Sequence, residues 1–597
     1  MACIFSGTGG GAPDTGDRVG TRCFFFVTAD GESVTYEIEL VGSGPAAGAA
    51  AAAFEDIDAR VVEAAEDPAL TIAVVPAGSD VDDAVGPRER LVVVEIGGVG
   101  GHVIESVDAG VSVFGPVGAD FADLRARVAA TTDSAGSPSG ERSAVRLAGA
   151  IAGRRAIALL TGDGGVSGTV VEVSGTGITA ERPILPVPDP TSRDRSVRRE
   201  YRAADLDDSL ARAERALDER TGIVAQVGER ESFPVPYYLA QTADTEGFSD
   251  ARAAEFAAGV DSDWDAAFMK ALGEALERYC AGVYRGSEFT VAPERTRARP
   301  VSPSRFVRPD DYQAPDPETP IPWVSGVDLR TDEAVSLPAE FVHYPPPAEQ
   351  YKPAITTGLG LGNSGGEALL SGLYEVVERD ATMLAWYSTF EPLELRVSDP
   401  GYDELCKRAR AEDLSVTALL VTQDVDVPVV AAAVHRDGEW PRFAVGSGAS
   451  LDPTDAARSA LAEALQNWME LRSMGPERAS AESGAIGEYA DFPEAARDFV
   501  DADASVPAER VGPEEPPSGT TELTAAVERV ADAGLDAYAA RTTTADVASL
   551  GFEAVRVLVP EAQPLFQGSP FFGNRARSVP SDLGFEPEPE RPYHPFP

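Results

Sequence analysis

One short phrase occurs three times in the chain: ALGEALER at residues 271–278, YEVVERD at 374–380 and AEALQN at 462–467. Each contains Glu-x-x-Glu or Glu-x-x-Gln within a strongly helical stretch. Because positions three apart share one face of an α-helix, each phrase directs two oxygen-bearing side chains the same way. Three such helices directed at one place would form a pocket of carboxylates, which suits Mg²⁺ ions carrying a polyphosphate.

The same pattern on a single helix is more often a solvated face. Here the flanking residues argue against that interpretation, because segments such as 368–370 and 383–386 are apolar. Helices of this kind are buried on most sides, and buried carboxylates are costly unless they are paired or bind a metal. The threefold repetition therefore favours a functional site.

The composition limits the classes of function. The chain has 597 residues, enough for two to four domains, and 98 acidic against 50 basic residues give it a net charge of −48. Only three of the basic residues are lysines, namely Lys270, Lys352 and Lys407. This charge argues against nucleic acid and against an anionic membrane surface as partners. The acid excess runs along the whole chain and resembles proteins of halophilic archaea.

Cysteine usage and the N-terminal sequence favour a cytoplasmic protein. The four cysteines (Cys3, Cys23, Cys280 and Cys406) form no Cys-x-x-Cys pair, so they show neither a zinc nor a redox signature. We expect free thiols in a reducing compartment. The first residues lack the basic region and long apolar core of a signal peptide.

A Pro-, Asp-, Ser- and Arg-rich stretch at 183–195 separates two parts, which we predict as domains 1–190 and 196–597. The first part is predicted as a small α/β domain. It has strands at 22–28, 33–41, 70–76, 91–96, 168–173 and 177–180, and helices at 46–66, 121–130 and 143–160. Glycines at 97–101 could cradle a phosphate, but residues 102–107 have a strand pattern where that motif needs a helix, so a tight turn is favoured.

The second part alternates helices and strands, which predicts an α/β (α+β) fold with helices packed on mixed sheets. Its predicted helices are 204–220, 263–283, 366–386, 402–412, 454–471 and 521–533. Its predicted strands are 221–225, 235–241, 416–422, 427–433, 537–541 and 555–558. Residues 287–352 are expected to contain short strands and loops, residues 475–520 are expected to be loop-like, and the chain ends in a proline-rich tail.

Residues from about 200 to 597 resemble the YcaO-domain family. The resemblance is carried by GEALERY at 273–279, NSGGEA at 363–368, GLYEVVERDA at 372–381 and LAEALQ at 461–466. Each motif is weak alone, but their order across some 200 residues is specific. The final HPFP at 594–597 is similar to the proline-rich C-terminus of azoline-forming, SagD-like members.

The resemblance implies an ATP- and Mg²⁺-dependent enzyme that activates a peptide amide. In the family, a Cys, Ser or Thr side chain attacks the preceding carbonyl, and the amide oxygen is phosphorylated and leaves as phosphate. The expected activity is therefore cyclodehydration to azolines in a ribosomally made peptide, as in bacteriocin biosynthesis. Catalysis of this kind consists mainly of positioning and charge neutralisation.

The resemblance also implies a set of site residues. The metal ligands would be Glu274, Glu277, Glu367, Glu375, Glu378 and Glu463. The ATP-binding residues would be Arg278, Arg379, Asn363 and Gln466. The two arginines have two roles open to them: they contact phosphates, or they hold the glutamates by ion pairs. Pro595 and Pro597 would be catalytic residues that order the active site near the substrate.

Some positions depart from the family pattern and leave the chemistry open. Lys270 stands where a serine is usual, residues 257–260 lack the usual lysine, and Thr356-Thr357-Gly358 replaces Ser-Asn-Gly. Two alternatives therefore remain beside azoline formation. One is thioamide formation, or an accessory role in methylthiolation of ribosomal protein S12. The other is a non-catalytic scaffold that docks peptides.

The partners expected from the resemblance are a peptide substrate and a leader-peptide-binding or dehydrogenase protein. A homodimer is a further alternative. Residues 1–190 resemble a degenerate E1-like, ThiF-related domain that presents the peptide, with an independent α/β scaffold as the other interpretation.

Overall fold

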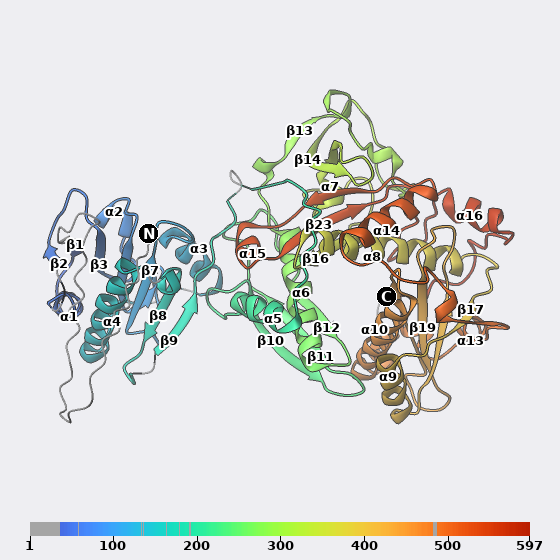
Figure 1. Ribbon diagram of the computed structural model, residues 1–597, viewed down its shortest axis with the longest axis horizontal. Helices are drawn as coiled ribbons and strands as arrows, with labels where there is room; N and C mark the ends of the chain where they lie inside the picture. The colour runs from blue at the N-terminus through green and yellow to red at the C-terminus, as the bar shows by residue number, and fades with distance from the viewer. Residues whose placement is uncertain are drawn as a thin grey trace, which may run out of the picture.

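The computed structural model describes residues 36–596 apart from 56, 58, 133, 135, 163, 178, 190–192 and 482–485. A smaller α/β part lies at one end of an elongated molecule and is followed by a larger part that contains three further multi-stranded sheets (Figure 1). The predicted fold class, α/β with mixed sheets, is confirmed. The expected strand at 22–28 lies outside the described residues. In the described part of the chain, no helix is long and apolar enough to cross a membrane.

The smaller part is built on one seven-stranded sheet. Its strands, in spatial order, are β2 (Ala59–Val62), β1 (Tyr36–Val41), β3 (Leu70–Pro76), β4 (Leu91–Ile96), β7 (Ala109–Phe114), β8 (Thr169–Val173) and β9 (Thr179–Pro183). The first four strands are mutually parallel, and the last three add in antiparallel fashion. The central strands are buried on both faces, which explains their nearly continuous runs of valine and isoleucine.

Helices cover both faces of this sheet. The helices α1 (Pro45–Ala52) and α4 (Arg142–Leu160) cover one face, while α2 (Val81–Val85) and α3 (Phe121–Thr131) cover the other. Alternate residues of β4 point to opposite faces of the sheet: Val92 packs in the hydrophobic core on the α4 side, and Val93 packs in the core on the α3 side. The result is a three-layer α/β/α unit.

Two predictions in this unit need correction. The predicted helix 46–66 ends at Ala52, because the β-branched pair Val61 and Val62 continues the sheet beside β1 instead. The predicted strand 102–107 is reduced to β6 (His102–Val103), which pairs with β5 (Gly98–Val99). These two strands form the predicted tight turn, and a helix does not follow the glycines.

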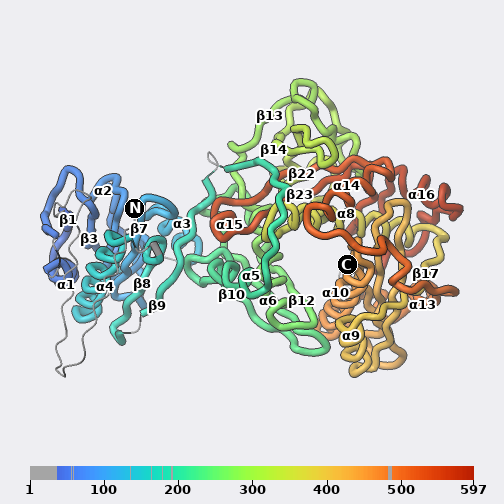
Figure 2. The backbone as a smooth tube through the Cα atoms, in the orientation of Figure 1, coloured from blue at the N-terminus to red at the C-terminus, as the bar shows by residue number. Residues whose placement is uncertain are grey.

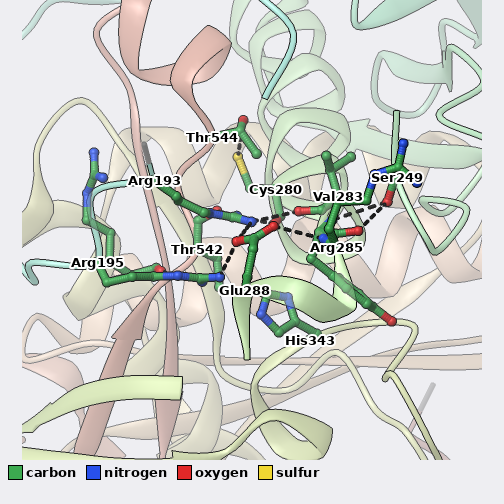
Figure 3. Close-up of polar contacts among 12 residues, drawn as sticks. Arg193, Arg195, Ser249, Cys280, Val283, Arg285, Glu288, His343, Thr542 and Thr544 are labelled. Carbon is green, nitrogen blue, oxygen red and sulfur yellow. Dashed lines mark hydrogen bonds and ion pairs between the residues drawn. The ribbon is translucent and has the colours of Figure 1, made fainter. Parts of the chain in front are cut away.

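An extended segment rich in arginine, residues 193–205, joins the two parts. It runs alongside the strands near residues 541–553 (Figure 2). Arg193 and Arg195 converge on Glu288, at 3.3 and 2.6 Å, and Arg193 also donates to the carbonyls of Val283 and Thr542 (Figure 3). The segment is therefore fastened to the larger part along its length.

The larger part contains three principal sheets. The first is β10 (Val224–Glu231), β11 (Tyr237–Thr242) and β12 (Phe256–Val260). The second is β13 (Thr290–Pro293), β14 (Pro320–Asp328), β22 (Tyr538–Arg541), β23 (Glu553–Leu558) and β16 (Leu359–Gly362), with β15 (Ala334–Pro338) paired to β14. The third is β20 (Phe443–Ala449), β19 (Val429–His435), β18 (Ser415–Leu420), β17 (Leu393–Arg396) and β21 (Ser505–Pro507).

The helices that carry the repeated phrase begin and end close to their predicted limits. The long helices are α6 (Trp264–Gly282), α8 (Gly365–Trp386), α9 (Pro400–Ala411), α10 (Pro453–Met474) and α14 (Thr520–Asp532). Shorter ones are α5 (Leu206–Ala213), α7 (Ala339–Val342), α11 (Pro476–Ala479), α12 (Ile486–Tyr489), α13 (Glu494–Val500), α15 (Ala545–Ser549) and α16 (Arg575–Leu583). The predicted helix 204–220 is thus shortened to α5, and the predicted loop 475–520 contains short helices.

A strand–helix unit is repeated three times, as β12–α6, β16–α8 and β20–α10. The strands of these units were not predicted. Each strand carries a glycine against its helix, namely Gly259, Gly360 and Gly446. A Cβ at these positions would come within 2.1, 2.2 and 2.4 Å of the backbone of the facing helix. Glycine therefore permits each helix to lie directly on its strand.

Candidate active site

The three strand–helix units hold their glutamates in the same way. In each unit the first Glu of the phrase accepts a hydrogen bond from a backbone N–H that lies 16 or 17 residues earlier. The pairs are Ala258 to Glu274 at 2.6 Å, Gly358 to Glu375 at 2.9 Å and Ser447 to Glu463 at 2.6 Å. The close strand–helix packing thus fixes the position of each carboxylate before any ligand is bound.

The three helices face one cavity of about 830 Å³. Eight of the predicted site residues line it: Glu274, Glu277, Arg278, Glu375, Glu378, Arg379, Glu463 and Gln466. We call this space the carboxylate cavity. The predicted convergence of the three Glu-x-x-Glu/Gln helices is therefore present in the structure.

Asn363 and Glu367 lie in an adjoining cavity of about 570 Å³ rather than in the carboxylate cavity. The two cavities share Glu274 and Glu277 along their walls. Asn363 donates to the Glu367 carboxylate through its backbone N–H at 3.0 Å and its side-chain amide at 3.3 Å. Its side-chain oxygen accepts from Ser209 at 2.9 Å. The side chains of Asn363 and Glu367 therefore line the adjoining cavity, whereas Glu375 lines the carboxylate cavity.

Burial and mutual repulsion shape the electrostatics of the carboxylate cavity. Burial, with the neighbouring carboxylates of Glu375 and Glu274, raises the pKa of Glu277 to about 8. Burial also raises the pKa of Glu378 to about 7, and Glu463 adds to this effect. The pKa of Glu274 and that of Glu463 are raised in the same direction by burial.

The oxygen ligands of this cavity fit Mg²⁺ in kind. In the described ranges, no three His, Cys, Asp or Glu side chains already form a group that could hold a metal ion. However, buried carboxylates that raise one another's pKa are stabilised by a divalent cation, which removes their repulsion. Magnesium prefers such oxygen ligands and shares them with the phosphates of a nucleotide.

The two arginines of the repeated phrase are placed differently. Arg278 forms an ion pair with Glu274 and donates to the Phe256 carbonyl at 3.2 Å. Arg379 forms longer ion pairs with Glu378 and Glu463, at 3.7 Å each, and donates to the Ser447 hydroxyl at 3.5 Å. Arg278 is therefore engaged with a glutamate, while Arg379 retains donors that face the cavity.

Other side chains of the site had no signal in the sequence. Ser447 links two units, because its hydroxyl donates to Glu378 at 2.7 Å while its N–H bonds to Glu463. Glu470 accepts from Gln466 at 3.0 Å and from the Tyr237 hydroxyl at 2.9 Å. The two glycines that flank Ser447 were the only local sign that this strand approaches a helix closely.

The proline-rich tail packs against the C-terminal end of α8. The Trp386 indole donates to the Pro592 carbonyl at 2.8 Å, and the backbone N–H of His594 bonds to the Tyr387 hydroxyl at 3.2 Å. Pro595 is buried, and Pro597 lies outside the described residues. Within the described tail, no residue lines the carboxylate cavity. The catalytic role of the two prolines stays a prediction.

Comparison with known proteins places this geometry in a family. The family model described as YcaO cyclodehydratase, ATP- and Mg²⁺-binding, matches residues 258–563. This range contains all three strand–helix units almost completely, and every predicted metal ligand. ATP and Mg²⁺ are thereby confirmed as the cofactors.

Individual relatives share parts of the chain. An uncharacterized protein in the tfuA 3′ region of Rhizobium leguminosarum bv. trifolii is 30% identical over 233 residues, which are 35% of this chain and 53% of that protein. An uncharacterized protein of Methanothermobacter thermautotrophicus is 31% identical over 227 residues, or 35% of this chain and 56% of that protein. The chain thus spans about half the length of the curated relatives it matches.

A solved structure shares the fold over nearly the whole chain. A heterocyclase in complex with substrate and cofactor has a TM-score of 0.71 and 19% identity, and the match covers 94% of this chain and 85% of that chain. The likeness of fold therefore includes the N-terminal α/β unit.

Proposed function

The chain belongs to the YcaO cyclodehydratase family, and from this we propose that it activates a backbone amide of a ribosomally made peptide with ATP and closes azoline rings at Cys, Ser or Thr. The observation that carries the proposal is the carboxylate cavity. Eight of the ten predicted metal and nucleotide ligands line it, and they come from three separate units.

The overall reaction fixes what the site must do. A substrate thiol or hydroxyl loses its proton and bonds to the carbonyl carbon of the preceding residue, the phosphorylated amide oxygen departs as phosphate, and the amide nitrogen loses its proton as the C=N bond of the ring forms. When bound, ATP would supply the phosphoryl group that makes the amide oxygen a leaving group, and Mg²⁺ would neutralise the charge of the phosphates. The residues of this chain then have to bind, orient and neutralise charge.

We assign roles to these residues from their contacts. The six glutamates would hold the metal-bound nucleotide. Glu274, Glu375 and Glu463 are each fixed by a backbone N–H of their own unit. Arg278 orients Glu274 through their ion pair. Arg379 donates to phosphate oxygens, since its nearest carboxylates are 3.7 Å away. Ser447 bonds to both Glu378 and Glu463 and so holds the two carboxylates in a fixed relative position.

The N-terminal unit is proposed to present the peptide. The domain boundary is proposed near residue 190, where the arginine-rich segment begins. The resemblance to an E1-like domain and the likeness of fold to a heterocyclase over 94% of the chain support this role. A leader-binding or dehydrogenase protein would be a further partner in this scheme.

The first experiment tests nucleotide binding. ATP with Mg²⁺ is titrated calorimetrically into the wild type, Glu378→Gln and the control Glu404→Gln, whose side chain is half-exposed on α9. We expect Glu378→Gln to abolish binding and the control to bind normally. Equal binding by all three proteins would reject the proposed site, and absence of binding in the wild type would favour a docking scaffold.

The second experiment tests the chemistry. Peptides encoded near the gene are incubated with ATP and Mg²⁺, while ADP and phosphate release are followed and the products are weighed by mass spectrometry. Loss of one water per modified residue supports azoline formation. Replacement of an oxygen by sulfur, when sulfide is supplied, would instead establish thioamide formation.

A further inference from the structure

Lys352 has no carboxylate of a described residue at ion-pair distance, although the charge of Glu340 acts on its ammonium from farther away. The chain has three lysines; Lys270 pairs with Asp261 at 2.7 Å and Lys407 with Glu404 at 3.7 Å. Lys352 makes no ion pair with any described residue, and its ammonium lies 5.6 Å from the centre of the Phe341 ring. An unpaired lysine is unexpected in a chain with 98 acidic residues.

Arg556 on β23 is a second cation of this kind. Its side chain is buried, with 3% exposed, and its two terminal nitrogens donate to the carbonyls of Thr356 at 2.8 Å and Ile355 at 2.9 Å. Within the described ranges it has no carboxylate at ion-pair distance, and its Nε is buried without a partner. The carboxylates of Glu375 and Glu277 act on this guanidinium only from beyond that distance, so an anion bound closer to it would offset the cost of its burial.

A small cavity of about 40 Å³ brings these two cations together with Arg379. None of the described residues along its wall is an Asp or a Glu; the other polar side chains there are Thr357 and Gln563. Arg379 also lines the carboxylate cavity, so the two spaces meet at this side chain. The small cavity therefore forms a cationic end to an otherwise acidic site.

We propose that Lys352, Arg379 and Arg556 form a subsite for a small oxyanion of the phosphate class, beside the nucleotide, with Arg379 shared between this subsite and the carboxylate cavity. The role we give it rests on the proposed function: it holds the phosphate that departs from the amide. The binding of the anion itself does not depend on that function.

Size and charge support this assignment. A volume of about 40 Å³ has room for roughly three water molecules, which is too little for a nucleotide and suits a small tetrahedral anion. Burial and the nearby Arg556 also lower the pKa of Lys352 to about 7. An anion in the cavity would favour the charged ammonium. A carboxylate of the substrate would bind to the same cations, and the experiment below distinguishes a carboxylate from phosphate.

The experiment uses the full chain saturated with Mg²⁺ and ADP, so that the nucleotide position is already filled. Inorganic phosphate is titrated calorimetrically at constant ionic strength into the wild type, Lys352→Met, Lys352→Arg and Lys407→Met. We expect Lys352→Met to weaken phosphate binding about tenfold or more, since it removes a charge-assisted contact. Lys352→Arg should retain most of the affinity, and Lys407→Met should match the wild type.

Several outcomes would overturn the subsite. These are equal phosphate affinity in Lys352→Met and the wild type, no phosphate binding by the wild type, or full displacement of phosphate by equimolar acetate. The last result would assign the cavity to a carboxylate. A wild type that binds phosphate through Lys352 but modifies no peptide would support the subsite and reject the proposed function. The two failures are therefore distinguishable.

Discussion

Arg127 of the N-terminal unit and Asp546 of the larger part form a buried ion pair, with Nη2 and Oδ2 2.7 Å apart. Their side chains are 2% and 0% exposed. The Tyr279 hydroxyl donates to the same Asp546 oxygen at 2.6 Å, and Tyr279 lies on α6 two residues beyond Glu277. The N-terminal unit is thus linked by two contacts to a helix that carries the carboxylate cavity.

Breaking this pair should destabilise the protein and loosen the nucleotide site. We expect Arg127→Met to lower the free energy of unfolding by about 3–5 kcal/mol, because it leaves Asp546 charged and buried without its partner. ATP affinity should also fall, since Arg127 no longer holds Asp546, the residue that accepts the Tyr279 hydrogen bond on α6. Denaturant unfolding and calorimetry measure the two effects. Arg295→Met, which breaks the exposed pair with Glu318, is the control and should change stability by less than about 1 kcal/mol.

Neutralising Glu277 should have opposite effects on the stability of the metal-free protein and on its affinity for Mg²⁺–ATP. In the metal-free protein its carboxylate is held among like charges in a buried position, which raises its pKa to about 8. We expect Glu277→Gln to stabilise the metal-free protein at pH 9, on the order of 2 kcal/mol, while weakening Mg²⁺–ATP binding. Thermal unfolding with and without Mg²⁺ tests this. Destabilisation of the metal-free protein by the same substitution would contradict it.

Metal binding should depend on pH in a defined direction. The raised pKa values of Glu277 and Glu378, about 8 and about 7, mean that both carboxyls hold protons at neutral pH or slightly below it. A metal must displace these protons, so Mg²⁺ affinity should rise from pH 6 to pH 9. Calorimetry in buffers of different ionisation enthalpy measures the protons released. Release that is the same in Glu378→Gln and the wild type would exclude that residue as a source.

The histidine of the tail should make the attachment of the tail sensitive to acid. Burial lowers the pKa of His594 to about 4, from an ordinary value near 6.5. The folded protein therefore binds this proton less readily than the unfolded chain. The stability contributed by neutral His594 is present above pH 6.5 and is lost as the pH falls through 4. The difference in unfolding temperature between the wild type and His594→Gln should shrink as the pH is lowered from 7 to 4.5. A difference that stays constant would count against this role.

The sequence predicted those parts of the site that have a local sequence pattern, and it missed the parts that have none. The helices α6, α8 and α10 were located to within three residues, because their apolar flanks and acidic pairs repeat at helical spacing. The strands β12 and β20 were missed, because residues such as Ala257 and Gly446 have low strand propensity and are placed by close packing against a helix. Lys352 and Arg556 carry no neighbouring pattern, so their shared cavity appears only after folding.

The division of the carboxylate cavity among three strand–helix units has a consequence for biosynthesis. The first pair of glutamates is made near residue 277 and the last predicted metal ligand at residue 463, so a chain still emerging from the ribosome has only part of the nucleotide site. ATP can therefore stabilise only molecules in which α10 has docked beside α6 and α8. Nucleotide binding then acts as a check on completed folding, and fragments split between α8 and α10 would regain it only by reassembling.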